Sequence, residues 1–190
     1  MDQIEQYKGG YIVYNLRTDL REIHQHFDKF TEDQVLGIAQ EQSPHYYNTL
    51  HKYRRKYPET KAGSLGFQVS ICINKDSILY CLQGFNAGVV LYNLAKMRAS
   101  EAYKLVAGRE GMTRLAEKYK VVEFIGGDQD WITLIGWEIP ELVYILPCQY
   151  NRQIQAMVDH DVSCFPTDKQ IYQDYHDCQN RPIVLHMIGD

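Results

Sequence analysis

The sequence predicts an α/β fold, in which helices cover a sheet. Short apolar runs typical of buried strands recur along the chain, at residues 11–14, 89–91, 143–146 and 183–186. The longer segments between them carry apolar residues at helical spacing. The pair Gly126-Gly127 precedes Asp128 and an apolar run, so we expect a buried helix with Asp128 as its N-cap. Alternating strands and helices indicate layers around one core.

The composition is that of one folded, soluble domain. With 190 residues the chain is long enough to bury a core, and 45% of its residues are hydrophobic against 23% charged. The formal net charge of −4 argues against nucleic acid as the main partner. We find no apolar run long enough to span a bilayer and no signal-peptide pattern. The five cysteines lack zinc-type spacing and, taken alone, also fit reduced thiols in the cytosol.

After the first strand we expect two helices, the second of which has a clear start. Residues 31–34, Thr-Glu-Asp-Gln, have the pattern of a capping box, so this helix would run from there to Ala39. Residues 51–57 are basic with interleaved aromatic side chains, as a phosphate or nucleic-acid patch would be. For one short charge run, a solvated helix face ended by Pro58 is favoured.

The middle of the chain is predicted to be helical. Two short helices are expected here, separated near residues 108–111, and Asn93 is the expected cap of the first. Their Met, Leu and aromatic residues are spaced as in a core rather than a cofactor site: Met97, Tyr103, Leu105, Met112 and Leu115. Residues 155–181 are polar and are predicted to be mostly loop.

Three polar motifs stand beside the expected strands and the buried helix. They are Phe85-Asn86-Ala87-Gly88, Asp128-Gln129-Asp130 and the segment from Pro147 to Arg152. Short amide and carboxylate side chains at such positions form a preorganised polar lining that could hold a sugar through its hydroxyls. Taken alone, the second motif is more simply explained as an ordinary capped helix. The combination of all three motifs favours a polar binding site instead.

The order of these motifs resembles a known enzyme family. Gly-Asp-Gln-Asp, a helix, Pro-Glu-Leu, a strand and Cys-x-Tyr-Asn-Arg-Gln are similar to the C-terminal half of retaining glycosyltransferase family 8, in particular its xyloside xylosyltransferases. The resemblance covers residues 11–190 apart from an insert. It implies the GT-A (Rossmann-like) fold and transfer of xylose from UDP-xylose to xylosyl-glucose O-linked to EGF-like repeats, as in Notch. It also implies dependence on Mn2+ and a lumenal domain anchored in the endoplasmic reticulum membrane.

The resemblance implies roles for individual residues. Asp128 and Gln129 match the pair that flanks the anomeric carbon and the acceptor hydroxyl, so they are the expected catalytic residues. Asn86, Gly88 and Gly189 would bind the donor, Asn86 at its sugar and Gly189 in the loop that meets the diphosphate. Gly88 would let the backbone approach the donor closely.

The acceptor side is implied by a second match. Residues 148–153 resemble a Cys-Thr-Trp-Asn-Arg-Gln stretch of the family, with Tyr150 in place of its Trp. The expected acceptor-binding residues are therefore Asp128, Tyr150, Asn151 and Arg152.

A metal ligand and a disulfide follow from the same resemblance. His186, with Gly189, matches the His-x-x-Gly of the family, whose His is a manganese ligand. Cys148 and Cys178 match cysteines of the resembled enzymes, and the secretory-pathway lumen permits a disulfide between them.

The chain departs from the family in two respects. The Asp-x-Asp that binds metal and phosphate should stand at the end of the first strand, but residues 13–19 read Val-Tyr-Asn-Leu-Arg-Thr-Asp. The uridine-binding units and the membrane anchor are absent from these 190 residues. We therefore expect the acceptor-side half of an enzyme, with an incomplete Mn2+ site and no sugar transfer by this chain alone.

Residues 69–83 are an atypical insert in this comparison. They alternate like two strands around a turn near Asp76, which would place Cys72 opposite Cys81. The resembled enzymes pass almost directly from a Gly-rich loop to Gly-Phe-Asn-Ser-Gly, which these residues interrupt before Gly84. Two explanations stay open: a genuine surface hairpin, or an unspliced intron that keeps the reading frame, since Val codons begin with GT and CAG encodes Gln.

Three functional hypotheses follow. The first is a UDP-xylose-dependent glycosyltransferase, and the choice between UDP-xylose and UDP-glucose is open. The second is an inactive derivative that binds the glycan acceptor, which the missing Asp-x-Asp favours for this chain. The third is an unrelated Rossmann-type protein that binds a small metabolite, which would require a glycine-rich phosphate loop that residues 11–19 do not contain.

Overall fold

The structure is a computed structural model that describes most of the chain. The described residues are 5–7, 10–12, 14–16, 20–41, 47–63, 68–74, 77–82, 84–121, 127–155 and 182–188. Within these ranges, no helix is both long enough and apolar enough to cross a lipid bilayer.

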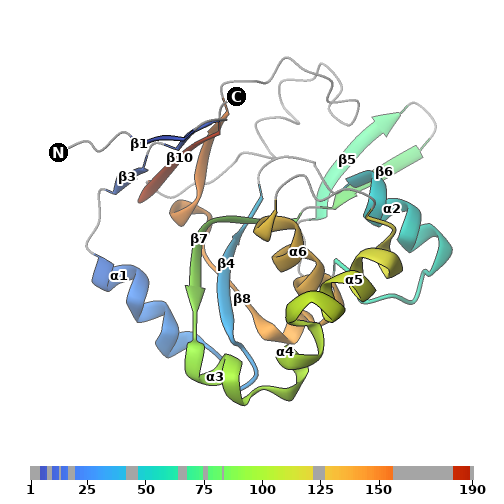
Figure 1. Cartoon of the computed structure of the whole chain (residues 1–190). Helices are drawn as coiled ribbons and strands as arrows, with labels where there is room; N and C mark the ends of the chain where they lie inside the picture. The colour runs from blue at the N-terminus through green and yellow to red at the C-terminus, as the bar shows by residue number, and fades with distance from the viewer. Residues whose placement is uncertain are drawn as a thin grey trace.

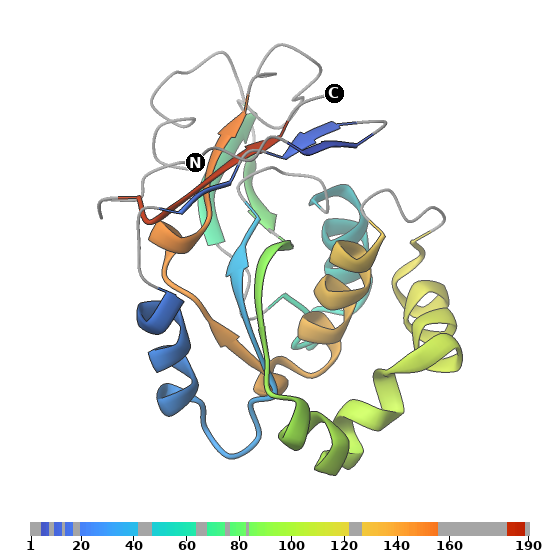
Figure 2. The same cartoon turned by 60° about the vertical axis from the view of Figure 1, so that its left-hand side comes forward.

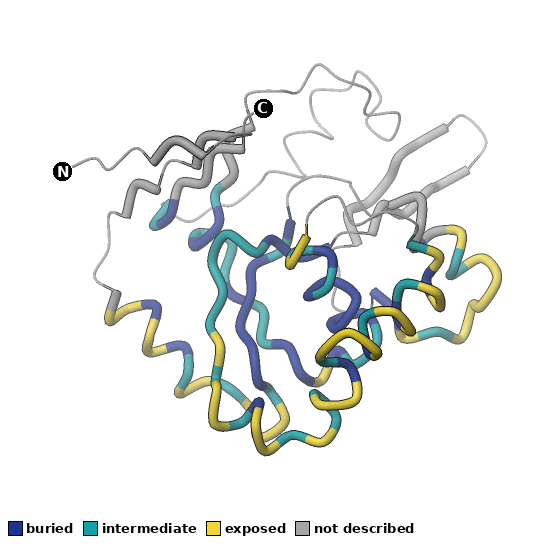
Figure 3. The backbone as a smooth tube through the Cα atoms, viewed as in Figure 1, coloured by how far each residue is buried: buried dark blue, intermediate teal, exposed yellow. Residues whose placement is uncertain are grey.

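A three-stranded sheet lies at the centre of the molecule (Figure 1). Its middle strand is β4 (Leu36–Gln40), which pairs antiparallel with β7 (Phe85–Tyr92) and parallel with β8 (Val143–Ile145). Residues 36–39 are all buried, and Figure 3 shows β4 in dark blue, the colour of buried residues, at the centre of the fold. A strand buried on both faces is typical of a sheet covered by helices on both sides.

Helices flank the sheet on two sides (Figure 2). On one side lies α6 (Asp128–Glu138), with α5 (Gly108–Tyr119) and α2 (Tyr47–Lys56) packed beyond it. On the other side lie α1 (Leu20–His24) and the 3-10 helix η1 (Gln25–Lys29). Most of α6 is buried, so the main core forms between this helix and the sheet, and burial of its apolar side chains is the main stabilising contribution.

Helix α6 approaches β7 very closely at Gly136. A Cβ atom at this position would lie only 2.3 Å from Cε2 of the buried Phe85 ring. Nearby, the hydroxyl of Thr133 accepts a hydrogen bond of 3.0 Å from the backbone N–H of Phe85. These two contacts fix the start of β7 against the helix.

Three helices follow β7, where two were predicted. They are α3 (Leu94–Ala99), α4 (Glu101–Val106) and α5. Asn93 caps the first of them as expected, because its side chain accepts from the N–H of Lys96 at 3.0 Å. The extra break arises at Ser100, whose hydroxyl caps α4 in the same way.

The predicted core residues of this helical region are only partly confirmed. Met97 and Leu115 are buried, and Tyr103 and Met112 are partly buried. Leu105 is 64% exposed, so its assignment to the core is wrong. The break at Ser100 changes the phase of the helical pattern, which turns Leu105 towards solvent.

The helix predicted for residues 31–39 is wrong, because this segment contains β4. The local signal was nevertheless real: the side-chain carbonyl of Gln34 accepts a hydrogen bond from the N–H of Thr31 at 2.9 Å. The amide nitrogen of Gln34 instead donates to the carbonyl oxygen of Val143 at 3.1 Å, which joins the turn to the neighbouring strand. A short apolar run is compatible with either element, and sheet pairing decided the outcome.

A second sheet is formed from distant parts of the sequence. β10 (Val184–Ile188) pairs antiparallel with β3 (Tyr14–Leu16) and parallel with β9 (Arg152–Gln155). The predicted last strand is thus confirmed and extends beyond His186. The predicted first strand is divided between β3 and the hairpin strand β2 (Gly10–Ile12), which pairs with β1 (Glu5–Tyr7).

The insert forms the predicted hairpin, but the predicted cysteine pairing is wrong. β5 (Gln68–Asn74) and β6 (Ser77–Leu82) run antiparallel. Cys72 lies opposite Leu79, and Cys81 lies opposite Val69. The turn begins one residue earlier than expected, and a register shift follows between Val69 and Cys72, so the two cysteines are not cross-strand partners.

Candidate functional site

Four segments meet at one end of the central sheet. They are the C-terminal end of β4, the start of β7, the first turn of α6 and the 3-10 helix η3 (Cys148–Tyr150), which follows β8 (Figure 1). The N–H of Glu41 donates to the carbonyl oxygen of Gly84 at 3.0 Å. The side-chain amide of Asn151 donates to the carbonyl oxygen of Gln40 at 3.1 Å. The carboxyl ends of parallel strands are a common place for ligand sites in α/β folds.

Strand β7 has a wide bulge at this end. Its pairing passes from Asn86 opposite Ala39 to Val90 opposite Ile38, so the β7 residues between them are extra. The side-chain oxygen of Asn86 accepts from the N–H of Gly88 at 2.9 Å, which stabilises the bulge. Bulges beside functional sites redirect side chains and backbone groups, and this one presents the N–H of Ala87 to Gln129 in the first turn of α6.

A cluster of polar side chains fills the space beneath the bulge. One carboxylate oxygen of Glu41, Oε2, accepts from Asn86 Nδ2 at 2.7 Å and from Gln129 Nε2 at 2.9 Å. Gln129 Oε1 in turn accepts from Asn86 Nδ2 and from the N–H of Ala87, both at 3.2 Å. Glu41 and Asn86 are each 1% exposed, while Gln129 reaches the surface. We call these three residues the amide cluster.

The first turn of α6 holds Gln129 in this position, although its N-cap is not the predicted residue. Gly127 is the N-cap, with φ 62° and ψ −111°, a conformation that favours glycine. Asp128 is therefore the first residue of the helix, not its cap, and its carboxylate lies at the positive end of the helix dipole.

The two aspartates of the motif have different environments. Asp128 is exposed, whereas Asp130 is 3% exposed and belongs to the packed part of the helix. Burial, and secondly the negative charge of Asp128, raise the pKa of Tyr92. Of the two, Asp128 is the carboxylate that a ligand at the surface could reach.

The expected acceptor residues surround η3. Tyr150 and Asn151 are 3% and 1% exposed, so they form the wall of the site, and Arg152 is partly exposed. The rings of His26 and Tyr150 pack edge to face at a centroid distance of 5.0 Å. His26 Nδ1 and the Tyr144 hydroxyl form a hydrogen bond of 2.9 Å. Burial, and secondly the Lys29 ammonium, lower the pKa of His26.

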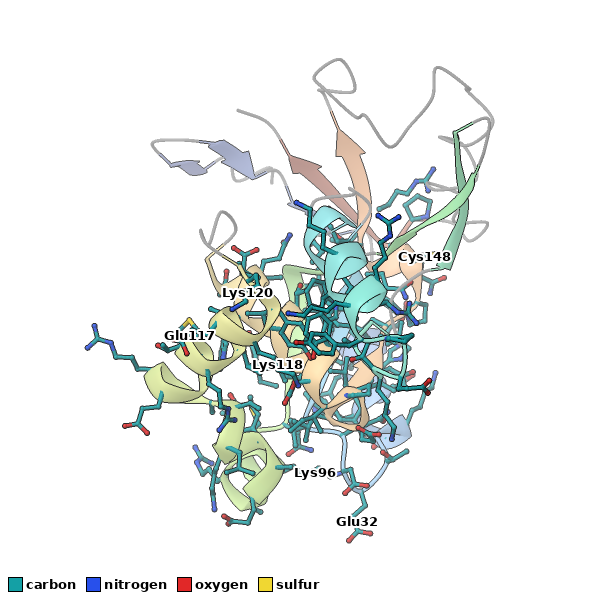
Figure 4. The ribbon with its side chains drawn as sticks, turned by 90° about the vertical axis from the view of Figure 1, so that its right-hand side faces the viewer. Glu32, Lys96, Glu117, Lys118, Lys120 and Cys148 are labelled. Carbon is teal, nitrogen blue, oxygen red and sulfur yellow. The ribbon has the colours of Figure 1, made fainter. Side chains whose placement is uncertain are left out.

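Cys148 is disulfide-bonded. Figure 4 shows it well away from α5, which carries Lys118. Cys178, its expected partner, lies outside the described residues, so the pairing between them stays a prediction.

The structure describes only part of the residues expected to bind the metal and the diphosphate. The backbone of His186 lies in β10, opposite Gln153 of β9 and Tyr14 of β3, while its side chain and Gly189 lie outside the description. Across the described residues, no three His, Cys, Asp or Glu side chains gather as ligands of a metal ion. The carboxylate and imidazole groups placed here therefore do not form a complete divalent-cation site.

The structure brings together most of the predicted site residues and adds two. Asn86, Gln129 and Asn151 meet at the same end of the sheet, as their motifs imply. Glu41 and His26 were missed. A glutamate directly after a buried strand was a usable signal for Glu41, but the incorrect helix assignment concealed it; the sequence carries no comparable signal for His26.

Comparison with known proteins finds relatives that are all named as glycosyltransferases. No protein-family model matches the chain. Mouse xyloside xylosyltransferase 1 is 34% identical over 171 residues, which cover 90% of this chain and 39% of the relative. Human xylosyl- and glucuronyltransferase LARGE1 is 32% identical over 172 residues, or 89% of this chain and 18% of the relative. The chain thus spans well under half the length of these glycosyltransferases.

A solved structure supports the fold. The apo crystal structure of mouse xyloside xylosyltransferase 1 matches with a TM-score of 0.67 and 34% sequence identity, covering 91% of this chain and 54% of that one. The predicted α/β fold, part of a GT-A glycosyltransferase, and the resemblance to the xyloside xylosyltransferases are both confirmed.

Proposed function

We propose that this chain forms the acceptor-side part of a retaining glycosyltransferase that transfers xylose from UDP-xylose to xylosyl-glucose O-linked to EGF-like repeats. Similarity to xyloside xylosyltransferases supports the sugar, and the same resemblance supports a lumenal location in the endoplasmic reticulum. The observation that carries the proposal is the amide cluster, which lies where the matched motifs imply a bound sugar.

The amide cluster suits the recognition of a sugar. Asn86 and Gln129 offer amide groups held by a buried carboxylate, so their orientation is fixed before a ligand binds. Fixed dipoles around a cation-like anomeric centre stabilise the transition state without reorganisation. Asp128, exposed beside Gln129, would accept hydrogen bonds from sugar hydroxyls.

The segment after β8 would hold the acceptor. Tyr150 and Asn151 are buried, so they shape the wall, and the partly exposed Arg152 follows them at the surface. The Asn151 side chain donates a hydrogen bond to the carbonyl oxygen of Gln40 at the end of β4, which fixes the position of this wall relative to the amide cluster. An acceptor hydroxyl and a donor carbon need this fixed geometry to react.

Only the similarity to other glycosyltransferases supports a divalent metal ion in this proposal. GT-A enzymes use a cation to neutralise the leaving diphosphate, and His186 is the proposed Mn2+ ligand of this chain. The described carboxylates and imidazoles do not complete such a site, so no step is derived through the metal.

The test measures binding of a glycopeptide. A synthetic EGF-like peptide that carries xylosyl-glucose is titrated into the 190-residue chain, with the unglycosylated peptide as reference. We expect saturation-transfer signals from the xylose protons and at least about tenfold weaker binding by Asp128→Asn, because one charged hydrogen-bond acceptor is lost. Glu117→Gln on the exposed side of α5 is the matched control. Equal binding of both peptides would contradict the proposal.

A binding module without transfer is the second candidate function. It is favoured by residues 13–19, which lack the Asp-x-Asp of the family while the acceptor motifs are in place. Transfer of radiolabelled xylose from UDP-xylose with Mn2+ distinguishes the two candidates. We expect the chain alone to bind the glycopeptide without turnover, and turnover above a Gln129→Ala control would reject this second candidate.

A further inference from the structure

Glu41 occupies a central place in the site although none of the matched motifs contains it. It directly follows β4, and its N–H donates to the carbonyl oxygen of Gly84 at 3.0 Å, so its backbone is fixed. Its side chain points into the amide cluster, where one oxygen accepts from the Asn86 and Gln129 amides. With 1% exposure, Glu41 is as buried as Asn86, whereas Gln129 reaches the surface.

Both amides donate to the same oxygen of Glu41, Oε2, which acts only as an acceptor here, so it dictates the orientation of both amides. Each NH2 group must face Glu41. Gln129 Oε1 is then directed to Asn86 Nδ2 and to the N–H of Ala87, both at 3.2 Å. Asn86 Oδ1 is directed to the N–H of Gly88 at 2.9 Å. A half-turn of either amide would disrupt the bonds that this amide makes, including its bond to Glu41 and the bond between the two amides.

We propose that Glu41 is a positioning residue, whose buried carboxylate fixes the amide orientation of Asn86 and Gln129 together with the β7 bulge. A glutamine at position 41 would have almost the same shape but would carry both donors and acceptors. It would therefore allow either orientation of its neighbours. The consequence for sugar binding rests on the proposed function, whereas the orientation of the amides does not.

The direct test follows the side-chain NH2 signals of Asn86 and Gln129 by 15N nuclear magnetic resonance. In Glu41→Gln we expect both pairs of signals to shift and their exchange with solvent to become about tenfold faster, because bonds to a charged acceptor are lost. Glu41→Asp retains the carboxylate and should restore part of the protection. A role limited to filling space would give the opposite order, because glutamine matches the volume of glutamate better.

Glu138→Gln is the matched control. This carboxylate lies at the other end of α6 and also accepts two hydrogen bonds, from Lys118 and Tyr119. Its replacement should leave both amide signals unchanged. If Glu41→Gln also leaves them unchanged, the proposal is overturned. If Glu41→Gln does not fold, the Glu41→Asp variant tests the proposal instead. Altered exchange at only one of the two amides would then show that Glu41 does not position Asn86 and Gln129 together.

A second measurement separates this proposal from the proposed function. Glycopeptide binding by Glu41→Gln should be at least about tenfold weaker, and Glu41→Asp should recover part of the loss. If the amide signals respond as expected but the unmodified chain does not bind the glycopeptide, the proposed function fails and the role of Glu41 stands. If the unmodified chain binds the glycopeptide but the amide signals do not respond in Glu41→Gln, the role of Glu41 fails and the proposed function stands.

Discussion

A carboxylate that accepts hydrogen bonds lies near each end of α6, but the partners of the two carboxylates differ. At the site end, Glu41 is almost fully buried and accepts from two neutral amides. At the far end, Glu138 accepts from the Lys118 ammonium and the Tyr119 hydroxyl, and its side chain is 23% exposed. The far end is a charge-compensated, partly solvated contact that stabilises the fold. At the site end, the Glu41 carboxylate instead orients the amide groups of Asn86 and Gln129.

Gly136, in the last turn of α6, should be highly sensitive to substitution. Gly136→Ala would place a methyl group 2.3 Å from the buried Phe85 ring, so we expect a loss of about 1–3 kcal/mol in the free energy of unfolding. Urea unfolding followed by circular dichroism measures this, with Glu117→Ala on exposed α5 as the control. In an uncrowded helix the same change from glycine stabilises by up to about 1 kcal/mol, so a gain would refute the close contact.

The far end should contribute to stability without affecting the site. Tyr119→Phe removes the hydrogen bond to Glu138, and we expect a loss of about 1 kcal/mol in the free energy of unfolding. Burial and the Glu138 carboxylate raise the pKa of Tyr119, so the hydroxyl is present as a donor at neutral pH. Tyr57→Phe, at a 46% exposed position, is the control. A change in the amide signals of Gln129 would show that the two ends are not independent.

The exposed carboxylate at the site end should matter little for stability. Asp128→Asn removes a favourable charge from the first turn of α6, and we expect a loss of only about 0.3–1 kcal/mol in the free energy of unfolding. The pKa of Tyr92 should fall, since the Asp128 charge is the second cause that raises it after burial. Carbon-13 titration of the Tyr92 ring measures this shift. An unchanged Tyr92 would contradict the placement of Asp128.

Protonation of His26 should leave stability unchanged at neutral pH and lower it increasingly in acid. Burial lowers its pKa, so the folded protein binds a proton less readily than the unfolded chain. Stability is therefore fully present above the ordinary pKa, about 6.5, and is lost as the pH falls from there through the lowered value. We expect His26→Gln to weaken this acid-induced loss in melting curves between pH 7 and pH 5. His24→Gln, at an exposed position, is the control, and parallel curves for His26→Gln and the unmodified chain would refute the burial argument.

The sequence predicted those features that depend on local chemistry or on a recognisable order of motifs. The buried helix after Gly127, the cap at Asn93 and the hairpin in the insert each follow from short-range patterns. The helix predicted around Gln34 failed because its capping-type hydrogen bond also forms in a turn that precedes a strand. Glu41 was missed because the incorrect helix assignment concealed its place at the end of a strand. His26 was missed because its partner Tyr144 lies far away in the sequence.

The second sheet has a consequence for the order of folding. β10 lies between β3 and β9, and its Val184 pairs with Leu16, so this sheet closes a loop that includes nearly the whole chain. Contacts so distant in sequence form slowly, because the entropy of closing the loop is lost before pairing compensates for it. The central sheet with α6 closes shorter loops and should fold first. We therefore expect pulse-labelled hydrogen exchange to protect β4 and α6 early and residues 185–187 late, so that the part of the site beside β9 is the last to become rigid.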